Sequence, residues 1–426
     1  MRHISDLQKA RERTHVFGVK LPFYGWAVVG VGTLIAFSSG PGQSYVFSVF
    51  IDSLIADTGF SRTNISALYA VGTGISAVMV MIVSRMADRY GPRLMVGLVA
   101  FGLGLACFGM AAASGPIAFF IAFAALRALG QGSMPVNATL LAAQWFVRYR
   151  GRAMAIVGLG FAASNALLPP LASYLIDSIG WRGAYMVLGV IVWALIIPSA
   201  IFIVRNRPED MGLHPDGAPE PPSQESAAQN PGLTDRPRKV LTSSMFWLLA
   251  IPLSVPSFVS TALVFHQVSI FDERGLSAAV AASVFVPYAI ASAFSGAAAG
   301  FIIDRIGPKN LFIINMAILL AATLTIHAVT SPLLATVYAS ILGISGGMQS
   351  VIGGVTWAHY YGRHGLGKVQ GSAMMVMITS AAIGPLPLAA LQQYSGGYTL
   401  GLTLMASLPV LAIVIIAFAR PKAAYA

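Results

Sequence analysis

Residues 88–93 read DRYGPR, and residues 304–309, 216 positions later, read DRIGPK. A second pair of related segments, WFVR at 145–148 and YYGR at 360–363, stands at an offset of 215. Two independent matches at nearly one spacing indicate that the chain is a duplication of two similar halves. Each repeated unit is therefore about half of the chain. The residues between the matching segments show whether it is built for water or for a membrane.

Those residues are too apolar for a water-facing protein. Hydrophobic residues make up 56% of the 426 and charged residues only 10%, with a mean hydropathy of +0.75. A soluble domain carries about 25% charged residues. A bilayer core about 30 Å thick requires roughly 20 consecutive apolar residues in helical form, and runs of that length follow one another along most of the chain. The composition therefore predicts an integral membrane protein.

The apolar runs predict an all-α fold of twelve transmembrane helices, arranged as two six-helix pseudo-repeats. A β-barrel would instead show segments of about ten residues with alternating polarity. Gly- and Pro-rich stretches at 39–42, 168–170 and 384–387 predict bends in the first, fifth and eleventh helices. The predicted spans are 24–50, 63–84, 93–113, 117–142, 152–178, 182–204, 245–270, 277–303, 309–329, 332–358, 368–394 and 397–419.

Residues 205–244 differ from everything around them. They are rich in Pro, Glu, Gln and Ser and have no apolar face, so they cannot bury enough surface to order themselves. We expect a flexible cytoplasmic linker here. The predicted parts are an N-terminal tail (1–23), a first six-helix half (24–204), the linker (205–244), a second half (245–419) and a C-terminal tail (420–426).

The basic residues indicate the orientation. All but four of the 26 Lys and Arg residues fall on the side of the predicted spans that holds both termini, and cytoplasmic loops carry such an excess. The exceptions are Arg62, Arg182 and Arg274 in the outer loops and Arg127 within a span. We therefore expect a multi-pass protein of a bacterial inner membrane with both termini cytoplasmic. The net charge of +11 reports this topology rather than nucleic-acid binding.

The duplicated segment resembles the loop motif of the major facilitator superfamily, approximately Gly-x-x-x-Asp-Arg-x-Gly-Arg/Lys. The first copy places Ser where the motif begins with Gly, and the second copy keeps the Gly. The resemblance covers nearly the whole chain and implies that these residues act in conformational gating. They are Ser84, Asp88, Arg89, Gly91, Arg93, Gly300, Asp304, Arg305, Gly307 and Lys309.

Within the superfamily, segments 23–29, 59–63, 145–153 and 181–185 are similar to the branch of monocarboxylate transporters and oxalate/formate antiporters. Carriers of that branch usually place an Arg in span eight, and the antiporters also use a Lys in span eleven. Here, residues 288–296 of span eight contain no cation, and Lys368 lies only at the inner end of span eleven. The usual anion anchors of the branch are therefore missing.

Arg127 is the one charge predicted to lie in mid-membrane. Such an Arg costs about 2.5–3.5 kcal/mol on insertion scales, and all 15 acidic residues fall at span ends or in loops. An Arg without a carboxylate partner in a cavity is a receptor for an anionic ligand, because its guanidinium can bind a carboxylate with two hydrogen bonds. The alternative is that Arg127 bonds backbone carbonyls or Gln131 and holds helices together.

His266, beside Gln267 in the outer part of span seven, could carry a coupled proton or bond a substrate; alternatively it is merely interfacial. A substrate acid could also carry the proton on its own carboxyl group. Polar side chains inside membrane bundles either line a cavity or bridge helices. The candidates of this kind for a central site are Tyr45, Tyr69, Gln131, Asn137, Asn165, Tyr288, Gln349 and Thr379.

These observations predict a secondary active transporter of a small organic anion, with a carboxylate as the leading substrate class, possible coupling to protons and an alternating-access mechanism. Transport of neutral or amphipathic molecules is the alternative within the same class, and a non-transporting membrane sensor or scaffold is an alternative outside it. No nucleophile motif, phosphate loop or metal-ligand cluster is visible, so we expect neither an enzyme nor a cofactor. The expected partners are a small-molecule substrate and membrane lipid, without nucleic acid, for a monomer.

Overall fold

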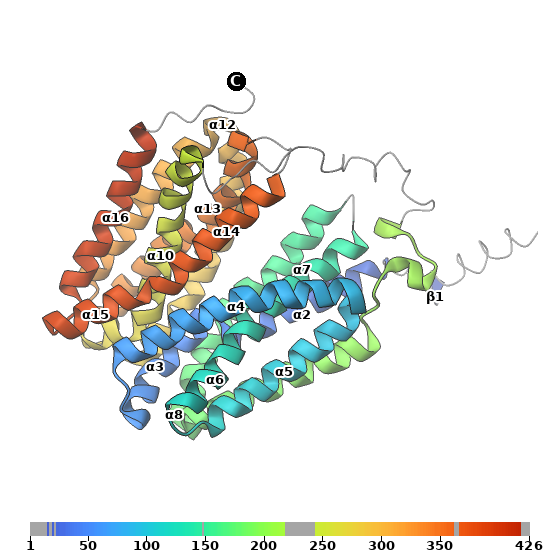
Figure 1. Ribbon diagram of the computed structural model, residues 1–426, viewed down its shortest axis with the longest axis horizontal. Coiled ribbons are helices and arrows are strands. Elements are labelled where there is room, and N and C mark those ends of the chain that lie inside the picture. The colour runs from blue at the N-terminus through green and yellow to red at the C-terminus, as the bar shows by residue number, and fades with distance from the viewer. Residues whose placement is uncertain are drawn as a thin grey trace, which may run out of the picture.

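The computed structural model describes residues 15–16, 19–20, 23–146, 149–217, 243–361 and 366–418, and it is nearly all helical (Figure 1). The strands in this part of the chain are β1 (His15–Val16) and β2 (Val19–Lys20), which pair antiparallel ahead of the first helix. The all-α fold predicted from the apolar runs is confirmed.

The helices of the first half run from residue 25 to residue 202. The first predicted span is split in two at the Gly-Pro-Gly sequence, and the fourth contains a π-helical turn. In order they are α2 (Gly25–Ser38), η1 (Gly40–Gly42), α3 (Ser44–Thr58), α4 (Arg62–Tyr90), α5 (Pro92–Ala112), α6 (Pro116–Leu126), η2 (Arg127–Ser133), α7 (Met134–Trp145) and α8 (Arg150–Phe202).

The helices of the second half repeat this pattern. They are α10 (Ser244–Asp272), α11 (Ala278–Ser283), α12 (Phe285–Thr325), η6 (Ile326–Ala328), α13 (Pro332–Tyr361), α14 (Leu366–Ile383), α15 (Pro385–Ser395) and α16 (Thr399–Phe418). The eleventh predicted span is interrupted at Gly384, as its Gly-Pro-Leu-Pro sequence suggested. By contrast, α8 stays helical through Pro169 and Pro170 and breaks only at Gly180.

Nine helices in the described part of the chain are long and apolar enough to cross a membrane. One of them, Arg152–Phe202, is 51 residues long and contains the break at Gly180, so it holds two of the predicted spans. Large apolar side chains on the helices face outward, with Phe301 78% exposed and Ile117 76% exposed. An apolar surface of this extent needs lipid rather than water around it. The count of twelve spans stays a prediction.

The duplication is visible in the backbone. Three pairs of glycines with positive φ stand 216 positions apart: Gly59 and Gly275, Gly91 and Gly307, and Gly180 and Gly396. Each pair ends one helix and turns the chain into the next, in a region that only glycine enters at little cost. One offset therefore relates equivalent positions of the two halves from residue 59 to residue 180.

The last residue of the duplicated loop segment has the same role in both copies. Arg93 donates from Nε and Nη2 to the carbonyls of Ala200 (3.2 Å) and Ile201 (2.6 Å), and Lys309 Nζ donates to the carbonyl of Ala417 (3.0 Å). These carbonyls lie at the C-terminal ends of α8 and α16, where free C=O groups and the helix dipole favour a cation. The basic residue thus ties the start of the third helix of each half to the end of the sixth.

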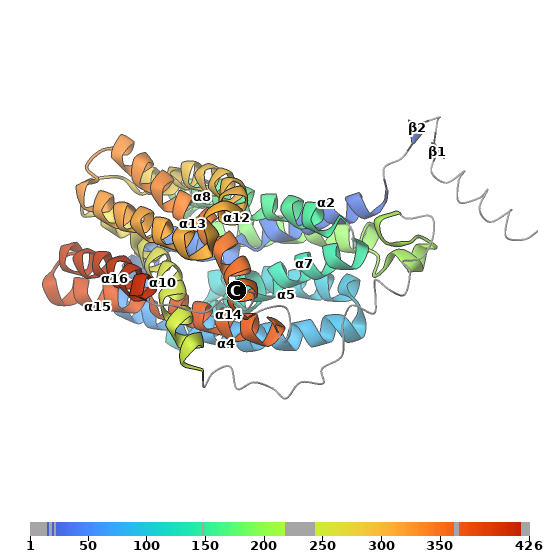
Figure 2. The same ribbon diagram turned by 90° about the horizontal axis from the view of Figure 1, so that it is seen from above.

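The two halves pack as two bundles, drawn blue to green and yellow to red (Figures 1 and 2). Here the outer end means the end with residues 59–61, 273–277 and 396–398, and the inner end is the opposite one. α4 lies beside α14 in both views, and α3 contacts α10. In Figure 1 the bundles meet at the outer end and diverge toward the inner end, where α16 ends.

The first part of the predicted linker is ordered against the first half. Residues 208–217 form two short 3-10 helices, η3 (Pro208–Met211) and η4 (Pro215–Gly217). Asp216 accepts a hydrogen bond from the Tyr149 backbone N–H (3.0 Å), and the Trp145 indole donates to the Arg205 carbonyl (3.2 Å). Local polar contacts of this kind were not readable from composition. Residues 218–242 of the linker lie outside the described residues.

Candidate functional site

Arg127 begins the seven-residue π-helix η2 in the middle of the fourth predicted span. Ser133 Oγ donates to the carbonyl of Ala128 (2.8 Å), five residues earlier. Gly130 lets this turn approach η1, since a Cβ there would lie 2.7 Å from the Gly42 Cα. The wide turn and the two glycines bring Arg127 against the break in the first span. π-helical turns within α-helices are frequent at functional sites.

The Arg127 guanidinium is fully buried and is surrounded by oxygen acceptors. Nε and Nη2 both donate to Thr73 Oγ1 (3.1 and 2.9 Å), and Nη2 also donates to the Tyr69 hydroxyl (3.1 Å). Nη1 donates to the Gly42 carbonyl (2.8 Å) and lies 3.5 Å from Ser44 Oγ. The charge also stands over the Tyr69 ring, 4.3 Å from its centroid. All hydrogen-bonding directions of the guanidinium are thus occupied by neutral groups.

No carboxylate pairs with Arg127 in the described part of the chain, where the two ion pairs are Arg62–Asp52 and Arg182–Asp57. Its donors are satisfied while its charge is not, and an uncompensated buried charge costs several kcal/mol. The contact to a backbone carbonyl matches the helix-bridging alternative raised above, but Gln131 is not among the partners. An anion can reach this charge only by replacing one of the present acceptors.

Oxygen acceptors without a donor lie around the same break. Gln131 Oε1, Asn165 Oδ1 and Ser38 Oγ are buried and have no hydrogen-bond partner. η1 packs against the segments that carry two of them: a Cβ on Gly42 would lie 2.9 Å from the Gln131 backbone nitrogen, and one on Gly40 would lie 2.8 Å from Oγ of Ser164, the neighbour of Asn165. Leaving a buried acceptor unpaired costs about 1–3 kcal/mol. These atoms therefore suit a ligand or water that brings hydrogen-bond donors.

Tyr45 and Tyr288 approach this region from the two halves. The Tyr45 hydroxyl donates to Ser164 Oγ (2.9 Å), and its ring lies 6.3 Å from that of Phe285 across the interface. The Phe285 ring lies in turn 6.4 Å from that of Tyr288. The structure therefore brings Tyr45 of the first half against Phe285 of the second, with Tyr288 beside Phe285.

The second half has no counterpart of the buried charge. The position 216 residues after Arg127 is Gly343, and the position 216 residues after Gly72 is Tyr288. In the first half Arg127 packs beside Gly72, whereas in the second half a Cβ on Gly343 would lie 2.3 Å from the Tyr288 carbonyl. Large and small residues have exchanged places between equivalent helices. The site is thus asymmetric, with a cation on one side and an aromatic residue on the other.

The remaining candidates bind helices of their own half. His266 Nε2 lies 2.9 Å from the Pro385 carbonyl and Nδ1 lies 3.2 Å from the Tyr398 hydroxyl, while Gln267 donates to the Ala281 carbonyl (2.8 Å). Gln349 donates to the Leu253 carbonyl (3.0 Å), and Asn137 donates to the Ser133 carbonyl (2.9 Å). In this conformation His266, Gln267 and Gln349 bridge helices, whereas Asn137 bonds a carbonyl four residues earlier in its own span.

The loop motif lies at the inner end, away from these residues. The side chains of Ser84, Asp88 and Asp304 lie outside the described residues. Arg89 lies over the Tyr90 ring at 5.3 Å, and Arg305 is exposed. A Cβ on Gly300 would meet nothing within 4 Å. Among the described residues, therefore, no neighbouring helix packs closely against Gly300 in this conformation.

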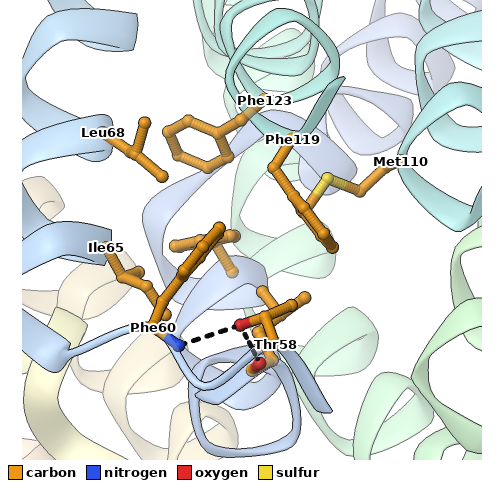
Figure 3. A pocket seen from close by; sticks show the side chains of 9 residues that line it. Thr58, Phe60, Ile65, Leu68, Met110, Phe119 and Phe123 are labelled. Carbon is orange, nitrogen blue, oxygen red and sulfur yellow. Dashed lines mark hydrogen bonds between the residues drawn. The ribbon is translucent and has the colours of Figure 1, made fainter. Parts of the chain in front are cut away.

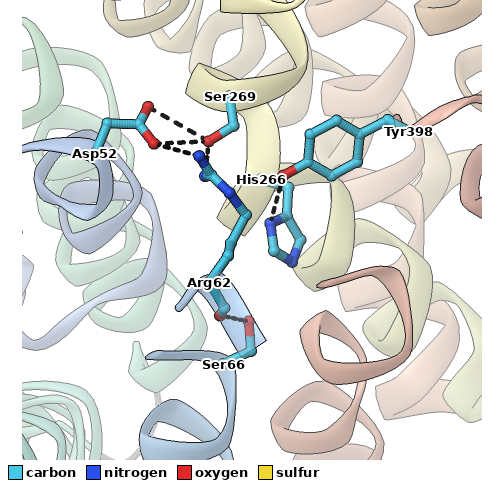
Figure 4. Close-up of polar contacts among 6 residues, drawn as sticks. All are labelled: Asp52, Arg62, Ser66, His266, Ser269 and Tyr398. Atoms are coloured by element: carbon cyan, nitrogen blue, oxygen red, sulfur yellow. Dashed lines mark hydrogen bonds and ion pairs between the residues drawn. The ribbon is translucent and has the colours of Figure 1, made fainter. Parts of the chain in front are cut away.

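Three residues that the sequence analysis did not single out join the halves at the outer end (Figure 4). Arg62 on α4 pairs with Asp52 on α3 (2.8 Å), and both bond Ser269 on α10. One signal was present in the sequence: opposite charges ten positions apart flank the turn at Gly59. The contact to the second half had no such signal.

A small apolar pocket lies within the first half, lined by residues such as Leu68, Met110, Phe119 and Phe123 (Figure 3). Its one hydroxyl, on Thr58, already donates to the Leu54 carbonyl (2.6 Å) and accepts from the Phe60 N–H (3.3 Å). The pocket offers no free polar group to an anion. Its lining comes from α3 to α6 and the turn at Phe60, not from the interface between the halves.

Comparison with known proteins places these features in a family. The family described as Major Facilitator Superfamily matches residues 32–385 and 258–425. A bacterial homologue of the human lysosomal transporter Spinster, solved in an inward-facing and occupied conformation, superposes with a TM-score of 0.68 over 93% of this chain and 96% of that one, at 16% identity. At that identity the match shows a shared fold.

The relatives found by sequence align with only part of this chain and part of their own length. A probable hexose phosphate transport protein of Chlamydia pneumoniae is 27% identical over 62% of this chain and 61% of its own. A probable L-galactonate transporter of Escherichia coli K12 is 31% identical over 35% and 33%, and rat monocarboxylate transporter 4 is 25% identical over 70% and 62%. The chain thus spans less than two thirds of the length of each of these relatives.

Proposed function

This chain belongs to the major facilitator superfamily, and from that premise we propose that it is a secondary active transporter of a small organic anion that works by alternating access. The substrate passes between the two halves, near the bilayer midplane, where parallel repeats of this kind place their sites. Gradients supply the energy. The protein lies in a bacterial inner membrane with both termini cytoplasmic, so that its interface opens toward the cytoplasm when the outer end is closed.

The observation that carries the proposal is the uncompensated charge of Arg127. A guanidinium held by five neutral contacts, without a carboxylate partner in the described residues, keeps its donors satisfied while the substrate is away. A carboxylate that replaces the Tyr69 and Ser44 hydroxyls would add the missing negative charge and could take two parallel hydrogen bonds. The charge then discriminates between an acid and its neutral analogue.

The unpaired acceptors support an anion that also carries hydroxyl groups. Gln131 Oε1 and Asn165 Oδ1 accept but cannot donate, and both lack a donor. The relatives named for a hexose phosphate and for L-galactonate have names that denote hydroxylated organic anions, and the third is named for monocarboxylates. A hydroxy acid would satisfy the guanidinium with its carboxylate, and a hydroxyl of the same molecule could supply a donor to one of the two amide oxygens.

Proton coupling needs no additional residue in this proposal. The Pro385 carbonyl accepts from His266 Nε2, so in the neutral ring Nδ1 accepts from the Tyr398 hydroxyl. A coupled proton on Nδ1 would require this hydroxyl to turn and accept instead. Transport of an anion together with a proton is equivalent to transport of the neutral acid. The coupled proton therefore needs to accompany the anion only in the net balance, while the carboxylate that meets Arg127 stays ionised.

The test is a thermal-shift screen of the detergent-purified protein with small carboxylic acids, hydroxy acids and their matched neutral amides. A ligand at 100 times its Kd raises stability by about 2.7 kcal/mol. We expect stabilisation by an acid but not by its amide, lost in Arg127→Gln and retained in Arg182→Gln, which removes an exposed Arg of the outer end. Equal stabilisation by acid and amide, or retention in Arg127→Gln, would refute the proposal.

A second candidate function is transport of neutral amphipathic molecules. One observation favours it: every hydrogen-bonding direction of Arg127 is already occupied within the protein. The aromatic residues at the interface, Tyr45, Phe285 and Tyr288, would then contact the apolar part of the substrate. Equal responses to an acid and its amide in the same screen would support this function.

A further inference from the structure

We propose that Asp52, Arg62 and Ser269 form a latch that holds the two halves together at the outer end and must open in each transport cycle. This inference concerns the closure of the interface and does not depend on which substrate passes through it. The three residues come from α3, α4 and α10, so the latch joins the first two spans of the first half to the first span of the second.

The contacts form a closed triangle (Figure 4). Arg62 Nη2 donates to Asp52 Oδ1 at 2.8 Å, and Arg62 Nη1 donates to the Ser269 hydroxyl. The Ser269 hydroxyl donates to Asp52, 3.0 Å from Oδ1 and 3.3 Å from Oδ2. The hydroxyl of one half thus accepts from the cation and donates to the anion of the other. Hydrogen bonds to charged groups are about twice as strong as neutral ones.

The packing around the triangle belongs to the same contact between halves. Phe265, one turn before Ser269 on α10, packs against Phe47 (5.8 Å between ring centroids) and Tyr69 (4.7 Å). Beyond the triangle, the Thr63 hydroxyl donates to Gln393 Oε1 (2.7 Å) on α15. α10 therefore contacts the first half through polar groups at Ser269 and, one helical turn earlier, through the aromatic ring of Phe265.

Two features suit these residues to a latch rather than to a permanent joint. The side chains of Arg62 and Asp52 are 20% and 37% exposed, so water can replace the contacts when the halves part. The positions 216 residues after Asp52 and Arg62 are Val268 and Ala278, so the duplicated half carries no second ion pair of this kind. Both charged residues, Asp52 and Arg62, belong to the first half, and they bond the Ser269 hydroxyl of the second half.

The experiment measures closure of the outer end by cross-linking. Cys107, the single cysteine, is replaced by Ala, and Thr63→Cys and Gln393→Cys are introduced on opposite sides of the interface. A short bifunctional methanethiosulfonate reagent joins the two thiols in membranes. A protease site inserted between residues 225 and 226 then separates the halves unless they are cross-linked, and a denaturing gel gives the rate of cross-linking.

We expect rapid cross-linking in the parent and a fall in rate of about three- to tenfold in Asp52→Asn and Arg62→Gln, as for loss of a partly exposed charge-assisted contact. Ser269→Ala, which keeps both charges, should show the same direction of change and serves if a charge variant does not fold. Asp57→Asn is the matched control: Asp57 lies on the same helix but pairs with Arg182 of its own half, and its rate should equal that of the parent.

Parent rates in Asp52→Asn, Arg62→Gln and Ser269→Ala would overturn the latch, as would an equal fall in Asp57→Asn. Because the readout needs no substrate, this failure is distinct from failure of the organic-anion proposal. That proposal fails in the thermal-shift screen, where the latch residues are unchanged.

Discussion

Replacing Arg127 with Gln should leave the empty protein as stable as the parent or make it more stable. The argument begins with what the change removes. Of the four groups that accept from the guanidinium, three keep another partner: Ser44 Oγ and the Tyr69 hydroxyl lie 2.7 Å apart, and Thr73 Oγ1 donates to the Tyr69 carbonyl (2.8 Å). Only the Gly42 carbonyl loses the donor that held it.

The sizes of two opposing free-energy contributions decide whether Arg127→Gln is more or less stable than the parent. One unsatisfied buried carbonyl costs about 1–3 kcal/mol, and the shorter Gln side chain can offset part of that cost. Removing an uncompensated buried charge returns several kcal/mol. The expected change in the free energy of unfolding therefore lies between about zero and 3 kcal/mol in favour of the variant. An Arg kept for structure alone would give the opposite sign.

The assay is the melting temperature of the detergent-purified protein without ligand, with Thr73→Val as a matched variant. Thr73→Val keeps the charge but removes the acceptor of two of its contacts, so it should destabilise the parent by about 1–3 kcal/mol. The same change in the Arg127→Gln background should have little effect. A large fall in melting temperature for Arg127→Gln, or a Thr73→Val effect that persists without Arg127, would refute the reasoning.

Three further predictions test separate contacts. Gly130→Ala should destabilise the protein by about 1–3 kcal/mol because its Cβ would meet the η1 backbone, whereas Gly158→Ala, with open space, should be neutral or stabilising in the same melting assay. Arg93→Gln should cost about 0.3–1 kcal/mol through loss of the α8 helix cap, and a neutral result would show that the cap contributes nothing. Tyr69→Phe, which frees an Arg127 donor, should tighten acid binding about two- to tenfold in a thermal-shift titration; weaker binding would indicate that the hydroxyl contacts the substrate.

Patterns of neighbouring residues in the sequence predicted the helices, the repeat and the orientation, because each of these is read from residues close together in the chain. The duplicated segment, the apolar runs and the basic residues indicated the repeat and the helices, and the offset between copies recurs in the positive-φ glycines. The burial of Arg127 followed from its apolar neighbours. Its partners did not, because they lie on the first two spans, 54 to 85 residues away in the sequence. The π-helix at 127–133 also shifts the direction of the later side chains in its own span. A period of 3.6 residues assumed throughout would place them wrongly.

Contacts between the halves were the least predictable. Asp52 and Arg62 flank one turn, so their pairing could have been anticipated. Ser269 lies 207 residues from Arg62, and nothing in its neighbourhood distinguishes it from other serines of an apolar helix. The partners of His266 were equally unpredictable: its two nitrogens contact Pro385 and Tyr398, 119 and 132 residues away in the sequence, and its role in coupling stays a prediction.

Tyr69 connects the two regions on which the proposals rest. Its hydroxyl accepts from Arg127 and lies beside Ser44 Oγ, while its ring packs edge-on against Phe265 of the other half. An anion that takes the Arg127 donor from this hydroxyl acts on the side chain that also supports α10, one turn from the latch at Ser269. Binding at the centre and closure at the outer end therefore share a residue. A coupling carried in this way requires that the ring move when the hydroxyl loses its partner, and Tyr69→Phe separates the two contacts because it removes the hydroxyl and keeps the ring.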